Sequence, residues 1–244
     1  MIRLAGVLVS AIVLAAGLPA RADAQWYFGV YMGANHNSPA DVRFDDPSAS
    51  TAIVFHDVPF AAQPFQFPLY AGGRLGFRLP ARRFSVEAEW LHMKVIAETG
   101  QPMHVTGTLF GDAIDSTFPM AQLIQRYDMT HGLNFLMGNF VVRLPLGADA
   151  KPHPASVVFR VGAGPNMAGT DSQAGGIVVQ RYEHSGFGGQ AAAGLDLPIR
   201  GAWSATVEYK FTYAKPQISV GDGHGRTTAV ANQIAFGIAV GFSR

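Results

Sequence analysis

An alternation of apolar and polar residues along extended segments constrains this fold more than any other feature. In residues 203–214, WSATVEYKFTYA, every second residue from Trp203 to Tyr213 is apolar, and the residues between them are small, polar or charged. Side chains of a β-strand point alternately to its two faces, so this segment predicts a strand with one apolar and one polar face. The same alternation recurs in seven further segments: 26–35, 65–79, 84–95, 131–144, 156–165, 186–198 and 230–242.

The lengths and connections of these segments are typical of a barrel that crosses a membrane. Strands of about 10 to 14 residues exceed the usual soluble strand of about 5 to 6 and suit a tilted crossing of a bilayer. Short turns follow the second, fourth and sixth strands, whereas long polar segments follow the first, third, fifth and seventh, at 37–64, 97–129, 165–185 and 215–228. Long external loops and short periplasmic turns are the expected asymmetry of outer-membrane barrels.

The alternation alone does not say which face of the sheet is outside, because a soluble barrel shows the same pattern with its apolar face inward. Two features favour an apolar exterior. The apolar faces carry many aromatic side chains, too bulky for a narrow interior, and the opposite faces are rich in glycine and alanine. The sequence therefore predicts an all-β fold, an eight-stranded antiparallel transmembrane β-barrel with four long extracellular loops and short periplasmic turns.

One strand departs from a simple alternation. In residues 131–144 the apolar positions run through Leu133, Phe135 and Met137 and then change phase toward Phe140 and later residues. An extra residue in one strand of an antiparallel pair produces such a change, so we expect a β-bulge near Gly138 and Asn139, with Phe135 facing lipid.

The N-terminal residues predict export. A basic residue, an apolar core at 4–18 and the small-x-small pattern ending at Ala24 are typical of a signal peptide, which we assign to residues 1–24, with the barrel domain at 25–244. A membrane anchor is the alternative, but an apolar run of about 15 residues is short for a span. We expect the mature chain in the outer membrane of a Gram-negative bacterium.

The composition excludes several kinds of site. The chain contains no cysteine, which excludes disulfides, thiolate zinc sites and a cysteine nucleophile. Its formal net charge is +1, which gives no electrostatic reason to expect nucleic acid as a partner.

The strand periodicity, the pattern ending at Ala24 and the closing IAFGIAVGF resemble the small eight-stranded outer-membrane barrels of the OmpA and OmpX kind. This resemblance covers nearly all of the mature chain, and it implies outer-membrane lipid and the barrel-assembly machinery as partners. In that family the aromatic residue is usually the last one, whereas here Phe242 is followed by Ser243 and Arg244.

Charged residues collect on the predicted inner face, four of each sign. Isolated charges there cost several kcal/mol unless they are paired, so we predict an internal salt-bridge network that fills the barrel rather than a diffusion pore. A four-residue turn at 80–83 places Arg74 opposite Glu89. The alternative is a carboxylate pair, Glu87 and Glu89, that works in acid–base chemistry or binds a metal. The network residues are Arg74, Arg78, Glu87, Glu89, Arg160, Asp196, Glu208 and Lys210.

A second cluster is predicted where the third and fourth strands leave the membrane. His92 and Lys94 occupy lipid-facing positions there, and THGLN, residues 130–134, begins the return strand. Long basic side chains at this depth reach lipid phosphates, so we predict that Lys94, His92 and His131 contact lipid A, with Asn134 beside them. Most histidines and many acidic residues fall in the predicted loops, which leaves a divalent cation open but matches no metal-binding motif.

Two enzymatic alternatives stay open at this point. Segments such as EAEWLHMKV, THGLN and VEYKFTYA resemble barrel proteins grouped with bacterial lipid A oxidases, a resemblance that implies oxidation of the proximal glucosamine by oxygen, aided by divalent cations. Glu89, His92 and His131 would then be the catalytic residues. EHSG at 183–186 invites comparison with lipid A deacylases, but adjacent strand residues His184 and Ser185 point to opposite faces. A surface barrel that binds lipopolysaccharide or external partners without chemistry is the first interpretation.

Overall fold

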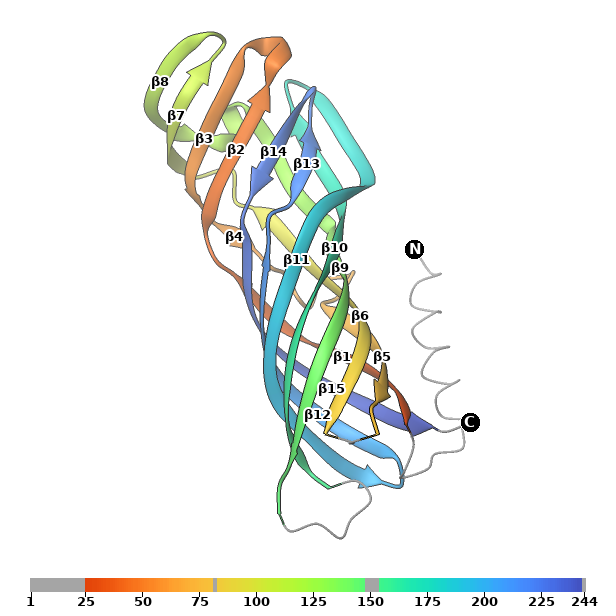
Figure 1. The fold of residues 1–244 in the computed structure, drawn as a ribbon. Helices are drawn as coiled ribbons and strands as arrows, with labels where there is room; N and C mark the ends of the chain where they lie inside the picture. The colour runs from red at the N-terminus through yellow and green to blue at the C-terminus, as the bar shows by residue number, and fades with distance from the viewer. Residues whose placement is uncertain (1–24, 81–82, 148–153, 243–244) are drawn as a thin grey trace.

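The computed structural model describes residues 25–80, 83–147 and 154–242. The predicted signal peptide lies outside the described residues. Eight long antiparallel strands follow the order β6-β5-β1-β15-β12-β11-β10-β9, and pairing of β9 with β6 closes them into a barrel (Figure 1). Their bounds are β1 Trp26–Asn37, β5 Ala71–Arg78, β6 Phe84–Ala97, β9 Ile124–Pro145, β10 Ser156–Ala174, β11 Ile177–Arg200, β12 Trp203–Ala214 and β15 Ala229–Phe242. No helix within the described ranges is long and apolar enough to span a membrane.

The outer wall of the barrel is apolar. Its exposed side chains include Trp26, Leu75, Phe84, Leu136, Phe140, Phe159, Phe211 and Phe236. The inner face carries polar and small residues, and its glycines make room for two tyrosines: a Cβ on Gly72 would lie 2.1 Å from the Tyr31 ring, and one on Gly76 would lie 2.1 Å from the Tyr27 ring. Closure pairs the backbone groups of every strand, which a lipid environment requires. The predicted transmembrane barrel with its apolar face outward is confirmed.

The predicted bulge in the fourth barrel strand is misplaced. Gly138 and Asn139 of β9 pair with Ala88 and Glu87 of β6 without a shift, and the register changes farther up the strand, between Met93 and Val95 of β6. Near that shift Gly132 has a φ of +92°, a conformation that suits glycine. The prediction that Leu133, Phe135 and Met137 face lipid is wrong, because all three side chains are buried in an apolar core inside the barrel.

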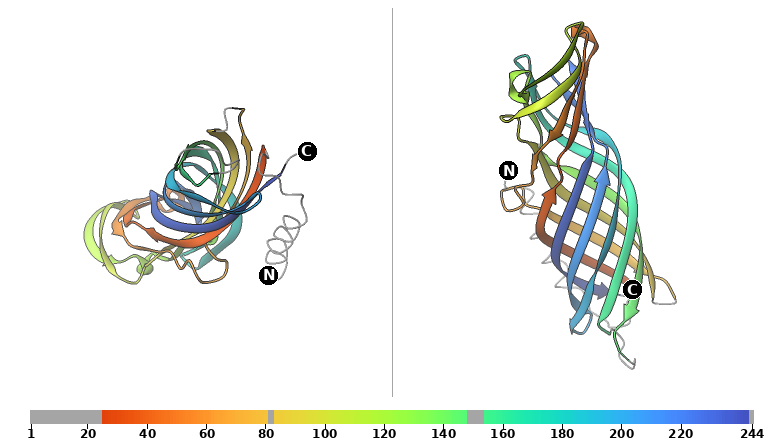
Figure 2. Two further views of the ribbon diagram at one scale, coloured as in Figure 1. Left: turned by 90° about the horizontal axis from the view of Figure 1, so that it is seen from below. Right: turned by 90° about the vertical axis from the view of Figure 1, so that its left-hand side faces the viewer.

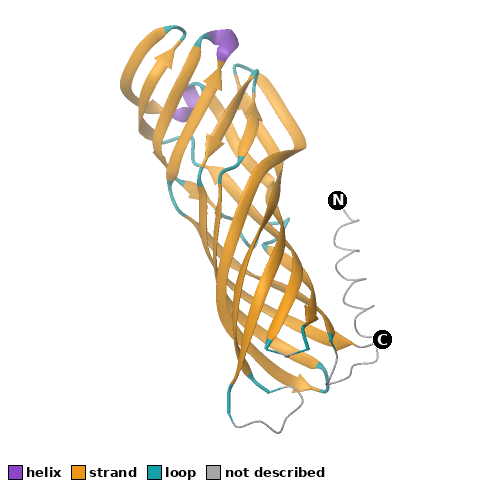
Figure 3. Ribbon diagram, in the orientation of Figure 1, coloured by secondary structure: helices purple, strands orange, loops and turns teal. Residues whose placement is uncertain are grey.

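Much of the sequence predicted as long external loops forms a second sheet above the barrel (Figures 2 and 3). Its six strands follow the order β13-β14-β2-β3-β7-β8. Their bounds are β2 Ala40–Asp46, β3 Thr51–Val58, β7 Pro102–Leu109, β8 Asp112–Pro119, β13 Gln217–Val220 and β14 Gly223–Thr227. We call this sheet, with the upper parts of β9, β10 and β11, the extension. It also contains two 3-10 helices, η1 Pro47–Ala49 and η2 Met120–Gln122.

The extension has an apolar core of its own. Ile53 and Phe55 of β3, Val105 of β7 and Met129 of β9 are fully buried in one hydrophobic cluster. This cluster continues downward into the upper barrel through residues such as Phe135. The predicted second strand is also shorter than expected, because β5 begins only at Ala71 and residues 62–70 form a loop between it and β4, Phe60–Ala61. The chain is therefore a barrel with a polar lower interior and an apolar upper one.

Candidate functional site

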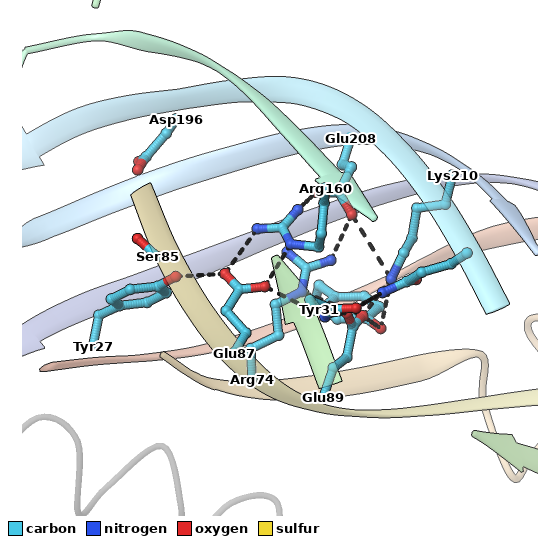
Figure 4. A network of polar contacts seen from close by, with 12 residues as sticks. Tyr27, Tyr31, Arg74, Ser85, Glu87, Glu89, Arg160, Asp196, Glu208 and Lys210 are labelled. Carbon is cyan, nitrogen blue, oxygen red and sulfur yellow. Dashed lines mark hydrogen bonds and ion pairs between the residues drawn. The ribbon is translucent and has the colours of Figure 1, made fainter. Parts of the chain in front are cut away.

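The lower barrel interior holds a dense network of ion pairs (Figure 4). Glu87 of β6 accepts hydrogen bonds from Arg160 Nε at 2.5 Å and Arg160 Nη2 at 3.0 Å, and from the Tyr27 hydroxyl at 2.6 Å. Arg160 also pairs with Glu208, whose other oxygen takes a hydrogen bond from Arg74 Nη2 at 2.5 Å. Arg74 stands opposite Glu89 in the β5–β6 pairing, as predicted.

Glu89 is the second centre of this network. Its carboxylate pairs with the ammonium group of Lys210 and lies 3.3 Å from Arg74 Nε. It also accepts hydrogen bonds from Asn139 Nδ2 at 2.6 Å and Gln190 Nε2 at 2.5 Å. Lys210 is fully buried, and the Glu89 carboxyl is enclosed on every side by donors. A carboxylate committed in this way is a structural partner rather than a general base open to substrate.

Arg143 completes the network and was missed by the sequence reasoning. It donates to the Ser85 hydroxyl at 2.5 Å, and its Nε lies 3.6 Å from the Asp196 carboxylate. The apolar positions Phe140, Val142 and Leu144 put Arg143 on the inner face, so the parity of this part of the strand is the signal that could have found it. Arg78 lies over the Tyr27 ring at 5.3 Å. The cavity among these side chains has a volume of about 30 Å³, room for only a few water molecules, so the charges fill this part of the barrel.

The second predicted cluster forms on the outer face, where β6 and β9 pass from the barrel wall into the extension. His92 pairs with Asn134 across these strands. The Asn134 side-chain oxygen accepts a hydrogen bond from Trp90 Nε1 at 3.3 Å and contacts His92 Nδ1 at 3.0 Å. Its amide nitrogen donates to the carbonyl oxygens of Gly132 at 3.0 Å and Met167 at 3.3 Å. We call Trp90, His92, Lys94, His131 and Asn134 the rim cluster.

Lys94 and His131 flank this arrangement. Lys94 Nζ donates to the carbonyl oxygens of Gln66 at 2.9 Å and Phe67 at 3.4 Å, so it holds the 62–70 loop against the wall. Phe65 and Phe67 of that loop are 77% and 57% exposed. His131 lies exposed at the register shift in β9, with its ring 6.4 Å from that of Tyr182. The rim cluster thus combines basic groups with exposed aromatic side chains at one level of the barrel.

Carboxylates above the rim cluster differ in their electrostatic state. Burial, and next the neighbouring charge of Asp171, raise the pKa of Asp128 to about 7. Asp128 therefore carries less than its full negative charge near neutral pH, and Asp171 is paired with Arg126 at 2.5 Å. Hydrogen bonds from Thr170 and Ser219 outweigh burial and lower the pKa of Glu183. Glu183 is ionised and pairs with Arg181 at 3.2 Å, so the negative charges of Asp171 and Glu183 both have a basic partner.

Comparisons with known proteins bear on the fold alone. No protein-family model and no curated protein sequence matches the chain. Among solved structures, Neisserial surface protein A (NspA) is 10% identical, with 89% of this chain and 97% of that chain covered and a TM-score of 0.44. OprG from Pseudomonas aeruginosa is 11% identical, with 91% and 97% covered and a TM-score of 0.39. The outer membrane protein AlkL is 8% identical, with 91% and 92% covered and a TM-score of 0.39.

Closure of the eight strands and their apolar outer wall decide the class of protein. The chain is an eight-stranded transmembrane β-barrel. Its strands bring Trp90, His92 and Asn134 together on the outside, with Lys94 and His131 nearby, but they place Glu89 inside among the interior charges. Glu89 and His92 therefore lie on opposite sides of the wall and do not form one site.

The structure does not pair His184 with Ser185. His184 packs its ring 5.7 Å from that of Phe187, while the side chain of Ser185 is buried, so these neighbours point apart as the alternation predicts. Across residues 25–80, 83–147 and 154–242, no group of three histidine or acidic side chains is arranged to hold a metal ion.

Proposed function

We propose that this barrel binds lipopolysaccharide at its outer rim through the phosphorylated headgroup of lipid A. The observation that carries the proposal is the rim cluster, which gathers the side chains of Lys94, His92 and His131 on the lipid-facing side, just below the extension. Basic side chains at the interface of a membrane are positioned to meet headgroup phosphates. The proposal requires no chemical step.

The surroundings of the rim cluster support a lipid ligand. Trp90 and Tyr182 lie beside the histidines, and aromatic side chains of this kind occupy the membrane–water interface in barrels. The exposed Phe65 and Phe67 project from the loop that Lys94 holds. Lys94 is 5% exposed beneath that loop and two of its three ammonium protons bond to loop carbonyls, so we assign the third to a phosphate oxygen.

The position of Glu89 does not support the lipid A oxidase that the sequence suggests as an alternative. A lipid A oxidase that used Glu89 together with His92 and His131 would need all three around one sugar carbon. Glu89 is 3% exposed and bonded to Lys210 and Asn139 within the barrel, behind the wall that carries His92. Binding without chemistry is the function that this geometry supports best.

Replacing Lys94, His92 and His131 together by alanine is expected to lower co-purification of lipopolysaccharide at least about fivefold, because the charge-assisted bond from Lys94 to phosphate and the contacts of the two histidines with the lipid are lost. Lipopolysaccharide bound per folded protein is measured after detergent extraction and affinity purification. The matched control replaces Arg43, Lys215 and His224, which are exposed on or near the extension, and should leave binding unchanged. Heat-modifiable migration on a gel verifies folding. Unaltered co-purification in the folded rim variant would sink the proposal.

A further inference from the structure

The lipid-facing wall is hollowed directly beside the rim cluster. A groove of about 640 Å³ crosses β1, β5, β6 and β9, a volume in the range of small-molecule sites. Its floor consists of small residues, Gly73, Ala88 and Gly138, and a Cβ on Gly138 would meet no atom within 4 Å. Larger apolar side chains border it, namely Phe28, Val30, Leu75, Trp90 and Leu136.

Trp90 lies between this groove and His92, whose Nε2 has no hydrogen-bond partner. Its indole lines the groove, and its ring centroid lies 6.1 Å from that of His92. His92 is 5% exposed, and its Nε2 is a buried atom without a hydrogen-bond partner. A buried polar atom left unpaired costs free energy, so the position of Nε2 favours a ligand that supplies the missing bond.

The hydrogen bonds around Asn134 determine whether that ligand must carry a hydrogen-bond donor or an acceptor. The Trp90 indole is only a donor, so the Asn134 atom that it contacts at 3.3 Å must be the amide oxygen. The same oxygen contacts His92 Nδ1 at 3.0 Å, which therefore carries the proton and donates. In the neutral ring Nε2 is then an acceptor. A lipid that completes this site must therefore carry a hydrogen-bond donor that reaches His92, next to the Trp90 ring that lines the groove.

We propose that the groove and His92 Nε2 together bind one acyl chain that carries a hydroxyl group near its headgroup end. The chain occupies the apolar groove, and its hydroxyl donates to Nε2. The inference rests on the proposed function and deepens it, because it names the feature by which the rim selects a hydroxylated, phosphorylated lipid over phospholipids whose acyl chains offer no donor. The continuity of the groove with the basic rim cluster, through Trp90, argues for one ligand that meets both.

Two ligands that differ only in the hydroxyl group test whether the site recognises it. The probes are glucosamine 1-phosphates that carry an N-linked tetradecanoyl chain with or without a 3-hydroxyl group, titrated against the full-length mature protein by native mass spectrometry from detergent. We expect the hydroxylated probe to bind about tenfold more tightly, as loss of one bond to a buried acceptor implies. His92→Phe should abolish this preference. Equal affinity of the wild-type protein for both probes would overturn the assignment of the hydroxyl.

Substitutions that fill the groove test whether it holds the acyl chain. Ala88→Leu should weaken binding of both probes at least about fivefold and keep the preference for the hydroxyl, because the added carbons occupy the space of the chain. Gly138→Leu, which has open space for its side chain, is a second variant in case the first folds poorly. The control is Ala193→Leu, the same change at an exposed position of the wall outside the groove. Undiminished binding in both folded groove variants would overturn the site.

A third probe separates this inference from the proposed function. The hydroxylated chain on glucosamine without phosphate should bind more weakly, because it lacks the charge that the rim cluster meets. Equal binding with and without phosphate would contradict the proposed function, while a retained preference for the hydroxyl would still support the groove and His92.

Discussion

Replacing Glu89 with glutamine is expected to lower the free energy of unfolding by about 3 to 5 kcal/mol, because it leaves buried cations without their counter-charge. Lys210 is fully buried and would keep a hydrogen bond to the Tyr31 hydroxyl at 3.0 Å and the more distant carboxylate of Glu208 at 3.7 Å. Arg74 would lose the charge that now lies 3.3 Å from its Nε. Urea unfolding of the refolded barrel, followed by gel migration and tryptophan fluorescence, measures this loss.

Two variants show whether the effect comes from unpaired charge. Adding Lys210→Met to Glu89→Gln should recover most of the lost stability, because both members of the buried pair are then neutral. Asp45→Asn breaks an exposed pair with Arg43, whose side chain is 57% exposed, and should cost at most about 1 kcal/mol. A loss below about 1 kcal/mol for Glu89→Gln alone would mean that the interior network does not hold the barrel together.

Replacing Phe55 with alanine is expected to destabilise the extension by about 3 to 5 kcal/mol while the membrane barrel remains folded. Phe55 is fully buried, and its ring lies 6.2 Å from that of Phe118 in the core that the second sheet encloses. The membrane barrel depends instead on closure of its strands and on the interior charges. Limited proteolysis should therefore cut the variant within the extension and leave a heat-modifiable barrel fragment.

The exposed end of the same sheet provides the control for this experiment. Phe110 is 67% exposed at the β7–β8 turn, so Phe110→Ala should leave the rate of proteolysis unchanged. Equal resistance of the Phe55 variant and the wild-type protein would show that the upper apolar cluster contributes little to the extension.

The membrane barrel could be predicted because its signal is local. Each strand in lipid shows an apolar outer face, so alternation within a short segment reveals both the strand and the direction of its side chains. The strands of the extension could not be recognised in this way. In β3 Ile53 and Phe55 alternate as barrel residues do, but the surrounding polar segment of 37–64 was typical of a loop. Phe135 and Met137 were assigned to lipid because an apolar upper interior cannot be told from a membrane face by periodicity.

The candidate site shows the same limit. Alternation alone placed the interior charges, because each of these side chains needs only the parity of its own strand. The contact of His92 with Asn134 depends on the pairing of β6 with β9, whose register fixes neighbours 42 residues apart in sequence. The separation of Glu89 from His92 was available from parity, since Glu89 and Trp90 face opposite sides. The resemblance to lipid A oxidases obscured it.

Binding of a phosphorylated lipid at the rim is the central claim, and native mass spectrometry with two forms of lipid A tests it most directly. The forms carry the same acyl chains and differ only in the presence of phosphates. We expect the wild-type protein to retain phosphorylated lipid A at about tenfold lower concentration than the dephosphorylated form, as charge-assisted bonds imply. The variant that lacks Lys94, His92 and His131 should retain both alike. Equal retention of both forms by the wild-type protein would contradict the account.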